Sequence, residues 1–511
     1  MLHVNGVAFW HFAISILPVF GYIIGVLLIV KLPFMPSLSS FDNDQPNVSL
    51  NPATFQTLDD WLTYIHGIHM SAIDMGLSRV RPVADMLGIT AWGNNRDGDN
   101  VNQQITAHVF MVAGTNGKGS TTATIAQICQ QAGHKTALYQ SPHLLKFNER
   151  VRIDGQSVSD EWLIDAFKRV EEARLACQVS LSFFEMTTLA ALLIFADANC
   201  DVWVLEVGLG GRLDVVNLID ADVAVITNVG IDHVDWLGDN RESIGYEKAG
   251  ILRQGMTLIY GEADMPASVA KQIEQLDVTV YQAGRDYGFY QHDADMGANK
   301  LTCGQQWQYS NPAITLNLPY PNLSLVNVTN AISAVLASGL SISDEHVRMA
   351  MPQVRMPGRF DLRHIGERQW LFDVAHNQEG INFLLEQLQQ RLPSMVRTLP
   401  TVQTTDANKG QIRLLFSMLV DKDIDKVVTH LQQANLPIVK WYVGVINHVR
   451  AASADTLQQV LSQHLASEHY HIYDDMASAT QAVQADSTAD ELILVCGSFH
   501  TIAESLGYLG A

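Results

Sequence analysis

Residues 107–131 read AHVFMVAGTNGKGSTTATIAQICQQ, and this stretch decides the fold of the chain. It passes from an apolar run through a glycine-rich turn into a segment with helical character, which predicts a strand, a phosphate-binding loop and a helix. Glycines let backbone N–H groups approach an anion closely, and the start of a helix adds unpaired N–H donors. The glycines of the turn are Gly114, Gly117 and Gly119. We therefore expect nucleotide phosphates to bind here.

The polar side chains of the loop suit a phosphate and its metal ion. Lys118 supplies a mobile positive charge for the outer phosphates, and Ser120 or Thr121 supplies a hydroxyl for Mg²⁺. The sequence GTNGKGS meets the usual G-x-x-x-x-G-K-[ST] pattern only approximately, because a glycine follows the lysine. The alternative is a glycine-rich turn with an incidental lysine, and the flanking strand and helix signals argue against it.

Composition indicates more than one domain and disfavours a nucleic-acid partner. A chain of 511 residues is too long for one ordinary core, and its 47% hydrophobic content supports two or more. The 32 basic and 53 acidic side chains give a formal net charge of −21, the wrong sign for a general binder of phosphate backbones. The five cysteines form no C-x-x-C pair, which fits a reducing compartment such as the cytoplasm.

The amino-terminal part, residues 1–34, contains an apolar segment at 7–30 without a formally charged side chain. It is long enough to span a bilayer, and Lys31 after it favours an enzyme tethered on the cytoplasmic side. The competing interpretation is a mis-called start, with translation beginning at Met35. Residues 35–52 are polar and rich in Ser, Asn, Asp and Pro, which predicts a flexible leader.

Other strand ends bring candidate ligands to the same place. A buried strand at 201–207 carries Glu206 near its end, and a strand at 223–227 leads into a loop with His233. Lys248 lies in a helical pattern at 241–253. A carboxylate at the end of a parallel strand beside a phosphate loop is a common metal ligand. The alternative for Glu206 is that its side chain is exposed to solvent at the end of the strand. A lone histidine or lysine in such a place is more often structural than catalytic. The convergence of three strand ends favours a metal site.

A second run of alternating strands and helices begins beyond Arg359. The strand at 370–374 contains Asp373 and is followed by His376, and a strand at 492–496 is followed by Ser498. Helical patterns occupy 423–434, 455–465 and 476–485. We predict an α/β protein with a larger phosphate-loop mononucleotide-binding domain at 53–355 and a smaller doubly wound α/β domain at 356–511.

Eight blocks of this sequence, taken in order, resemble one known family. They are AGTNGKGS, SPHLLKFNERVRI, SFFEMTT, LEVGLGGRLD, DHVDWLGDNRESIGYEKAGIL, MPGRF, FDVAHN and VCGSFHT. Together they are similar to the dihydrofolate synthase and folylpolyglutamate synthase family of the Mur ligase superfamily. Two departures stand out: Val215-Val216 replaces the Ala-Thr common in the family, and the amino-terminal apolar segment has no counterpart there.

The resemblance implies a set of site residues. ATP is expected at Thr115, Asn116, Gly117, Lys118, Gly119, Ser120, Asn330, Arg359 and Asp373. Mg²⁺ is expected at Ser120, Ser141, Glu206, His233 and Lys248, the last matching a lysine that is carbamylated in the family. Catalytic roles fall on Lys118, Lys248, Asp373 and His376. Substrate contacts fall on Ile73, Asp74, Met75, Ser182, Phe183, Phe184, Glu185, Arg212 and Ser498. Phe183 and Phe184 either stack on a flat ring or place at least one ring in the core.

The implied activity is an ATP-dependent ligase with ATP and Mg²⁺ as cofactors. It would add L-glutamate to dihydropteroate, and to the γ-carboxyl of folates, through an acyl phosphate. We expect a monomer without a nucleic-acid partner, and a membrane partner only if residues 7–30 are real. Two alternatives stay open: another Mur-type amino-acid ligase, such as one acting on a UDP-linked muramic acid, and a membrane-tethered, nucleotide-gated binding module.

Overall fold

The computed structural model describes residues 52–69, 74–89, 107–291, 306–395 and 411–510. The apolar segment at 7–30, the leader before residue 52 and Ile73 lie outside these residues, so the predictions about them are not addressed. Within the described ranges, none of the helices combines the length and the apolar character needed to cross a bilayer. The chain from Phe55 onward forms one compact unit, and the short turn η1 (Pro52–Thr54) precedes it in the sequence.

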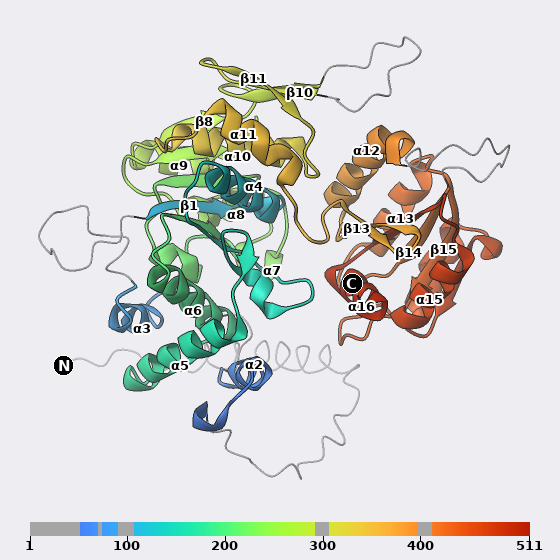
Figure 1. Cartoon of the computed structure of the whole chain (residues 1–511), viewed down its shortest axis with the longest axis horizontal. Coiled ribbons are helices and arrows are strands. Elements are labelled where there is room, and N and C mark those ends of the chain that lie inside the picture. Colours follow the sequence, from blue (N-terminus) through green and yellow to red (C-terminus); the bar gives the residue numbers. More distant parts are fainter. Residues whose placement is uncertain (1–51, 70–73, 90–106, 292–305, 396–410, 511) are drawn as a thin grey trace, which may run out of the picture. The chain divides into compact units, whose positions relative to one another are not determined.

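An eight-stranded sheet forms the centre of the first lobe (Figure 1). Its strands are β1 (His108–Ala113), β2 (Thr136–Tyr139), β3 (Val151–Ile153), β4 (Gln156–Ser157), β5 (Val202–Glu206), β6 (Val223–Ile226), β7 (Thr257–Tyr260) and β8 (Thr279–Gln282). The spatial order is β4-β3-β2-β5-β1-β6-β7-β8, and the six strands from β2 to β8 in that order are parallel. The carboxyl ends of β2, β5, β1 and β6 therefore meet along one edge, as the sequence predicts.

Apolar side chains alternate across this sheet because both of its faces are buried. On β1, Val109 and Met111 join one hydrophobic cluster, whereas Phe110 and Val112 join another. The first face is covered by α2 (Leu58–Gly67), α3 (Arg81–Met86), α5 (Asp160–Ala176), α6 (Phe183–Asp197) and α8 (Arg241–Ala249), with α7 (Val234–Leu237) and α9 (Ala267–Gln275) nearby. The second face is covered by α4 (Lys118–Gln131), α10 (Leu325–Ala337) and α11 (Asp344–Ala350), which lie together in Figure 1.

A three-stranded antiparallel sheet extends the second of these faces. It consists of β9 (Gly288–Gln291), β10 (Gln306–Ser310) and β11 (Thr315–Pro319) in the order β11-β10-β9. Trp307 and Tyr309 of β10 are fully buried against the same hydrophobic cluster as α10. The short turns η3 (Phe147–Arg150), η4 (Val215–Leu218) and η5 (Met351–Gln353) complete the lobe.

The second lobe contains a six-stranded sheet in the order β12-β13-β17-β14-β15-β16. These strands are β12 (Asp361–Ile365), β13 (Arg368–Asp373), β14 (Ile412–Phe416), β15 (Ile438–Gly444), β16 (Tyr470–Tyr473) and β17 (Leu492–Cys496), and only β12 is antiparallel. The helices are α12 (Gln378–Met395), α13 (Ile424–Gln433), α14 (Ala454–His464), α15 (Met476–Asp486) and α16 (Phe499–Leu509), and η6 (Ser467–His469) precedes β16. Two hydrophobic clusters, one on each face, confirm the predicted doubly wound α/β architecture.

Candidate active site

The phosphate loop follows β1 and is braced by the end of β6. Asn228 Oδ1 accepts hydrogen bonds from the backbone N–H groups of Thr115 (3.0 Å) and Asn116 (2.9 Å). Thr227 Oγ1 donates to the Asn116 carbonyl oxygen (2.6 Å). A Cβ atom at Gly114, where φ is +150°, would lie 1.8 Å from Thr227 Oγ1, so this close approach requires glycine. Protein contacts alone therefore hold the loop in shape.

Lys118 begins helix α4 and folds back over the loop. Its Nζ donates to the carbonyl oxygens of Gly114 (2.9 Å) and Thr115 (3.3 Å). Burial lowers the pKa of Lys118, and the negative charges of Glu206 and Asp232 oppose that shift. The ammonium group is thus kept at the loop, close to two carboxylates, where incoming phosphate oxygens could replace its carbonyl partners.

Glu206 lies at the end of β5, next to β1 in the sheet, and its side chain is 4% exposed. Burial raises the pKa of Glu206 to about 7, and the neighbouring Lys118 cation works against the shift. The backbone N–H of Ser141, just after β2, donates weakly to Glu206 Oε2 (3.4 Å). Three adjacent strands therefore bring the phosphate loop, Glu206 and Ser141 to one edge of the sheet.

His233 and Lys248 face the other side of the same loop. Together with Lys118 and Asp232 they line a small cavity next to Gly114. His233 precedes α7 with a φ of +51°, and burial lowers its pKa. Lys248 is 3% exposed, and burial together with the Lys118 cation lowers its pKa to about 7.

The carboxylate and hydroxyl oxygens at this edge fit a magnesium ion bound with a nucleotide. Among the described residues, no cluster of three or more His, Cys, Asp or Glu side chains is placed to hold a metal by itself. Mg²⁺ usually takes only one or two protein carboxylates and completes its shell with phosphate oxygens and water. Glu206 with the hydroxyls of Ser120 and Ser141 matches that donor set.

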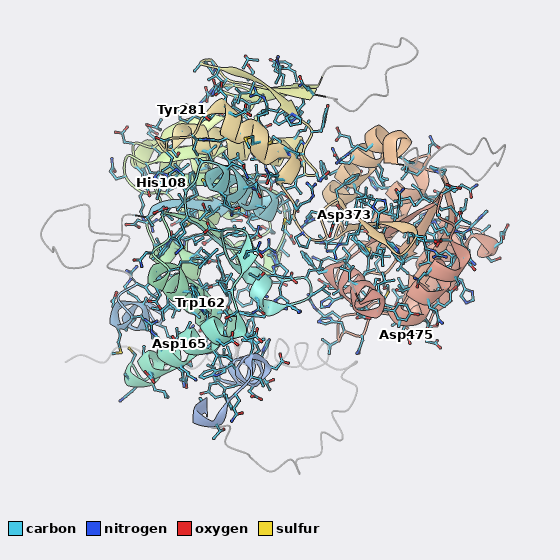
Figure 2. The ribbon with its side chains drawn as sticks, viewed as in Figure 1. His108, Trp162, Asp165, Tyr281, Asp373 and Asp475 are labelled. Atoms are coloured by element: carbon cyan, nitrogen blue, oxygen red, sulfur yellow. The ribbon has the colours of Figure 1, made fainter. Side chains whose placement is uncertain are left out.

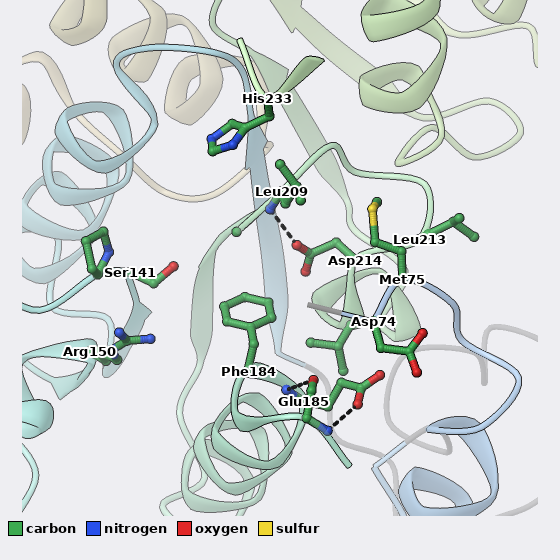
Figure 3. Close-up of a pocket in the computed structure, with 14 residues that line it drawn as sticks. Asp74, Met75, Ser141, Arg150, Phe184, Glu185, Leu209, Leu213, Asp214 and His233 are labelled. Carbon is green, nitrogen blue, oxygen red and sulfur yellow. Dashed lines mark hydrogen bonds between the residues drawn. The ribbon is translucent and has the colours of Figure 1, made fainter. Parts of the chain in front are cut away.

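A cavity of about 340 Å³ adjoins this edge (Figure 3). It extends from Ser141 and His233 to Asp74 and Met75, and Phe184 forms part of its wall. Phe183 is not among its lining residues; its ring packs 4.0 Å from that of His66 and against the core. Of the two aromatic rings, Phe184 is therefore the one placed to stack on a ligand.

Two predicted substrate contacts in this cavity are engaged by Arg79. Its guanidinium donates to both carboxylate oxygens of Glu185 (2.8 Å each) and to Asp74 Oδ2 (2.6 Å). Glu185 also accepts the backbone N–H of Ser182 (2.7 Å), while Ser182 Oγ caps α6 (Figure 3). Ser182 and Glu185 thus set the start of α6, and with it the position of Phe184.

Arg150 and Asp214 also line this cavity, and sequence reasoning did not single them out. Arg150 Nε donates to His143 Nδ1 (2.8 Å), and Asp214 accepts the backbone N–H groups of Leu209 (2.9 Å) and Val216 (3.0 Å). Burial raises the pKa of Asp214 to about 6. Both lie inside the quoted blocks SPHLLKFNERVRI and LEVGLGGRLD, so the available signal was their place in these blocks.

Arg212 points elsewhere. Its guanidinium donates to Glu247 Oε1 (2.8 and 3.1 Å) and lies over the ring of Tyr246, outside the residues that line the cavity. Its role as a substrate contact stays a prediction.

A cavity of about 190 Å³ contains most of the predicted nucleotide contacts. Asn116, Gly117 and Ser120 line it together with Arg359 and Asp373. Asp373, labelled in Figure 2, ends β13 and accepts the backbone N–H groups of Phe360 (2.8 Å) and Ala375 (2.9 Å). Burial raises the pKa of Asp373, and the Arg359 guanidinium opposes that change.

Three further predicted residues do not line this cavity. Asn330 is 1% exposed, and its Oδ1 accepts a hydrogen bond from the Tyr287 hydroxyl (2.8 Å). Ser498 Oγ caps α16 through the Thr501 N–H (3.0 Å). His376 Nδ1 donates to the Val374 carbonyl (2.8 Å), which leaves Nε2 as its acceptor. Their predicted roles remain untested.

Two family models match the chain, and they correspond to the two lobes. The Mur ligase middle domain matches residues 112–338, and the Mur ligase glutamate ligase domain matches residues 358–499.

Curated relatives match over nearly their whole length. The dihydrofolate synthase/folylpolyglutamate synthase of Escherichia coli K12 is 36% identical over 465 residues, which cover 91% of this chain and 98% of the relative. The enzyme of the same name from Haemophilus influenzae is 33% identical, covering 88% and 96%.

Solved structures agree with this assignment. E. coli FolC in complex with DHPP and ADP has a TM-score of 0.75 at 36% identity, covering 89% of this chain and 98% of that chain. The bifunctional folylpolyglutamate synthase/dihydrofolate synthase of Yersinia pestis, complexed with AMPPNP and a Mn ion, has a TM-score of 0.74 at 35% identity, covering 89% and 98%. With the phosphate loop and the adjoining cavities in place, the chain belongs to the dihydrofolate synthase/folylpolyglutamate synthase family of Mur ligases.

Proposed function

We propose that this protein is an ATP-dependent ligase that joins L-glutamate to dihydropteroate, giving dihydrofolate, and to the γ-carboxyl of folate mono- and polyglutamates. One observation carries the proposal: the phosphate loop, Glu206 and Ser141 lie on one edge of the sheet, next to a cavity with an aromatic wall. An acid bound in that cavity would meet the γ-phosphate at this edge. Ligation needs that proximity because its first step joins the two groups.

The reaction has two steps. The acceptor carboxylate attacks the γ-phosphorus of ATP, the bond to the β-phosphate oxygen breaks, and ADP leaves the acyl phosphate behind. The amino group of glutamate, after losing a proton, attacks the carbonyl carbon, and inorganic phosphate leaves as the amide forms. Both steps depend on positioning and on neutralising phosphate charge.

The residues of this chain supply those two functions. Lys118 would exchange its carbonyl partners for phosphate oxygens, and Arg359 lines the nucleotide cavity with a second positive charge. Glu206, Ser120, Ser141 and His233 would hold Mg²⁺, which neutralises phosphate charge when bound. The pKa of about 7 for Lys248 makes its neutral amine available, and that is the form that reacts with carbon dioxide to give a carbamate ligand.

On the acceptor side, Phe184 would stack on the flat ring of the pteroate, and Asp74 and Met75 line the same cavity. Asp373 and His376 would act near the incoming glutamate. We also propose that the enzyme works as a cytoplasmic monomer without nucleic acid. The free cysteines Cys129, Cys177, Cys200 and Cys496 support a reducing compartment, and the net charge of −21 argues against a nucleic-acid partner.

The test is a ligation assay on the full chain. Protein, ATP, Mg²⁺ and glutamate are mixed with dihydropteroate, tetrahydrofolate or a UDP-linked muramic acid, and the products are weighed by mass spectrometry. We expect at least one added glutamyl residue on dihydropteroate and on tetrahydrofolate, none on the muramic acid, and no product with Lys118→Ala. Product on the muramic acid alone, or ATP hydrolysis that is indifferent to glutamate, would overturn the proposal.

A further inference from the structure

A separate cavity of about 560 Å³ lies along helix α4, within the range typical of small-molecule sites, roughly 300–1,000 Å³. Ala126 and Gln130 of α4, Leu138 of β2 and Ser157 of β4 contribute to its wall. None of its lining residues also lines the acceptor, nucleotide or metal cavities described above. It is therefore a space separate from those three cavities.

Arg152 is the most unusual residue of this wall. It stands on β3 opposite Leu138, whose side chain belongs to the cluster under α4, so Arg152 projects from the same face of the sheet into the cavity. Its guanidinium forms no hydrogen bond or ion pair with any other side chain in the described ranges, although it is half-buried. The negative charge of Glu149 favours the Arg152 cation, but no hydrogen bond or ion pair joins the two side chains, so the donors of this half-buried guanidinium are open to a ligand.

The charge of the wall is positive. Its lining contains Arg152, Arg355, Arg363 and a single carboxylate, that of Glu149. Glu149 accepts the backbone N–H groups of residues 144, 145 and 146 at 2.8 to 2.9 Å, which uses most of the acceptor capacity of its two oxygens.

The two other arginines differ in how much of their hydrogen-bonding capacity is used. Arg363 is paired with Asp361 (2.8 Å), whereas Arg355 is exposed and donates only to the carbonyl oxygen of Val354 (2.9 Å) among the described groups. In a chain with a net charge of −21, such a positive cavity favours a negatively charged occupant.

We propose that this cavity is a second ligand site, for a small molecule carrying two or more carboxylate or phosphate groups. Arg152 binds one anionic group from the wall, and Arg355 binds another from the solvent side, because a guanidinium pairs with both kinds of oxyanion in a bidentate manner. The cavity contacts α4, the helix that carries the phosphate loop, and the segment at 353–357 that leads to Arg359. The proposal concerns binding alone and does not rest on the proposed function.

Calorimetric titration of the full chain tests the site. The protein is first saturated with ADP and Mg²⁺ to occupy the phosphate loop, and tri-γ-glutamate or tripolyphosphate is then added in separate titrations. We expect one-site binding of at least one anion, weakened tenfold or more in Arg152→Gln and several-fold in Arg355→Gln. The anion that binds more tightly identifies the class of the ligand.

Arg348→Gln is the matched control. Arg348 lies on α11 outside the cavity, pairs with Glu345 and is also arginine, so its replacement removes the same charge. Its affinity should stay within twofold of the parent protein. Equal weakening in all three variants would mean nonspecific attraction and would overturn the proposal. A failure of both anions to bind the parent protein would also overturn it. Arg355 is exposed, so Arg355→Gln should fold normally; unchanged affinity in that variant would also reject the site.

Discussion

Arg79→Met should destabilise the first lobe by about 3 kcal/mol at pH 8. The guanidinium holds both oxygens of Glu185, which is 3% exposed, and removing one partner of a buried pair costs about 3–5 kcal/mol. The expected loss is at the low end of this range because Glu185 still accepts a hydrogen bond from the Ser182 N–H. The lost contact with Asp74 adds little to the destabilisation, since the Asp74 side chain is 40% exposed and still lies 3.2 Å from His69 Nε2.

The loss should come from the buried negative charge of Glu185. Without Arg79, that carboxylate stays buried and keeps the Ser182 N–H as a hydrogen-bond partner, but it loses the opposite charge that both of its oxygens contacted. Glu185→Gln in the Arg79→Met background should recover part of the loss at pH 8.

Thermal melting and urea denaturation at pH 8 measure the stability of these variants. A loss of about 3 kcal/mol corresponds to roughly 5–10 °C in a lobe of this size. Arg169→Met is the control, because Arg169 forms an exposed ion pair with Asp197 and should cost about 1 kcal/mol or less. Of these two variants, only Arg79→Met should raise the KM for dihydropteroate. A melting point within 2 °C of the parent protein, or no recovery of stability when Glu185→Gln is added to Arg79→Met, would refute the reasoning.

Three other substitutions test separate parts of the site. Gly114→Ala should lower ATP turnover by about a hundredfold, because its Cβ would overlap Thr227, whereas Gly133→Ala, at positive φ in open space, should cost only about 1 kcal/mol of stability and no activity; near-equal turnover in the two would count against the loop geometry. Glu206→Gln should raise the Mg²⁺ concentration needed for half-maximal rate at least tenfold, and an unchanged Mg²⁺ titration would remove Glu206 from the metal site. The Asp214 pKa of about 6 exceeds its unfolded value, so its stabilising contribution is present below pH 4 and is lost as pH rises through 6. The unfolding free energy of the parent protein relative to Asp214→Asn should therefore fall by up to about 3 kcal/mol between pH 4 and 7.5. A constant difference would contradict the burial argument.

Local patterns predicted the scaffold of the site well. The glycine-rich turn after β1 and the apolar run ending in Glu206 are both encoded within a few residues. Once the strands are parallel, their ends must share one edge. The eight sequence blocks then identified the family, and the comparisons confirm it.

Pairing between distant segments could not be predicted in the same way. Arg79 and Glu185 are 106 residues apart, and nothing near Glu185 in the sequence indicates that its carboxylate is engaged. Phe183 and Phe184 are adjacent and chemically equal, and only the docking of α6 decides which ring enters the cavity. Asn327 lines the nucleotide cavity while Asn330, one helical turn later, is buried against Tyr287. Such choices depend on how helices pack, which local composition does not specify.

Glu206 stands directly across from Val112 in the ladder between β5 and β1. Successive side chains of a strand point to opposite faces of the sheet. The number of residues between 202 and 206 therefore determines which face carries the Glu206 side chain. Inserting or deleting one amino acid there would turn the Glu206 carboxylate away from the ATP side, although the glutamate itself would still be present. Spacing along this short strand is therefore under as strict a requirement as the identity of the acid that ends it.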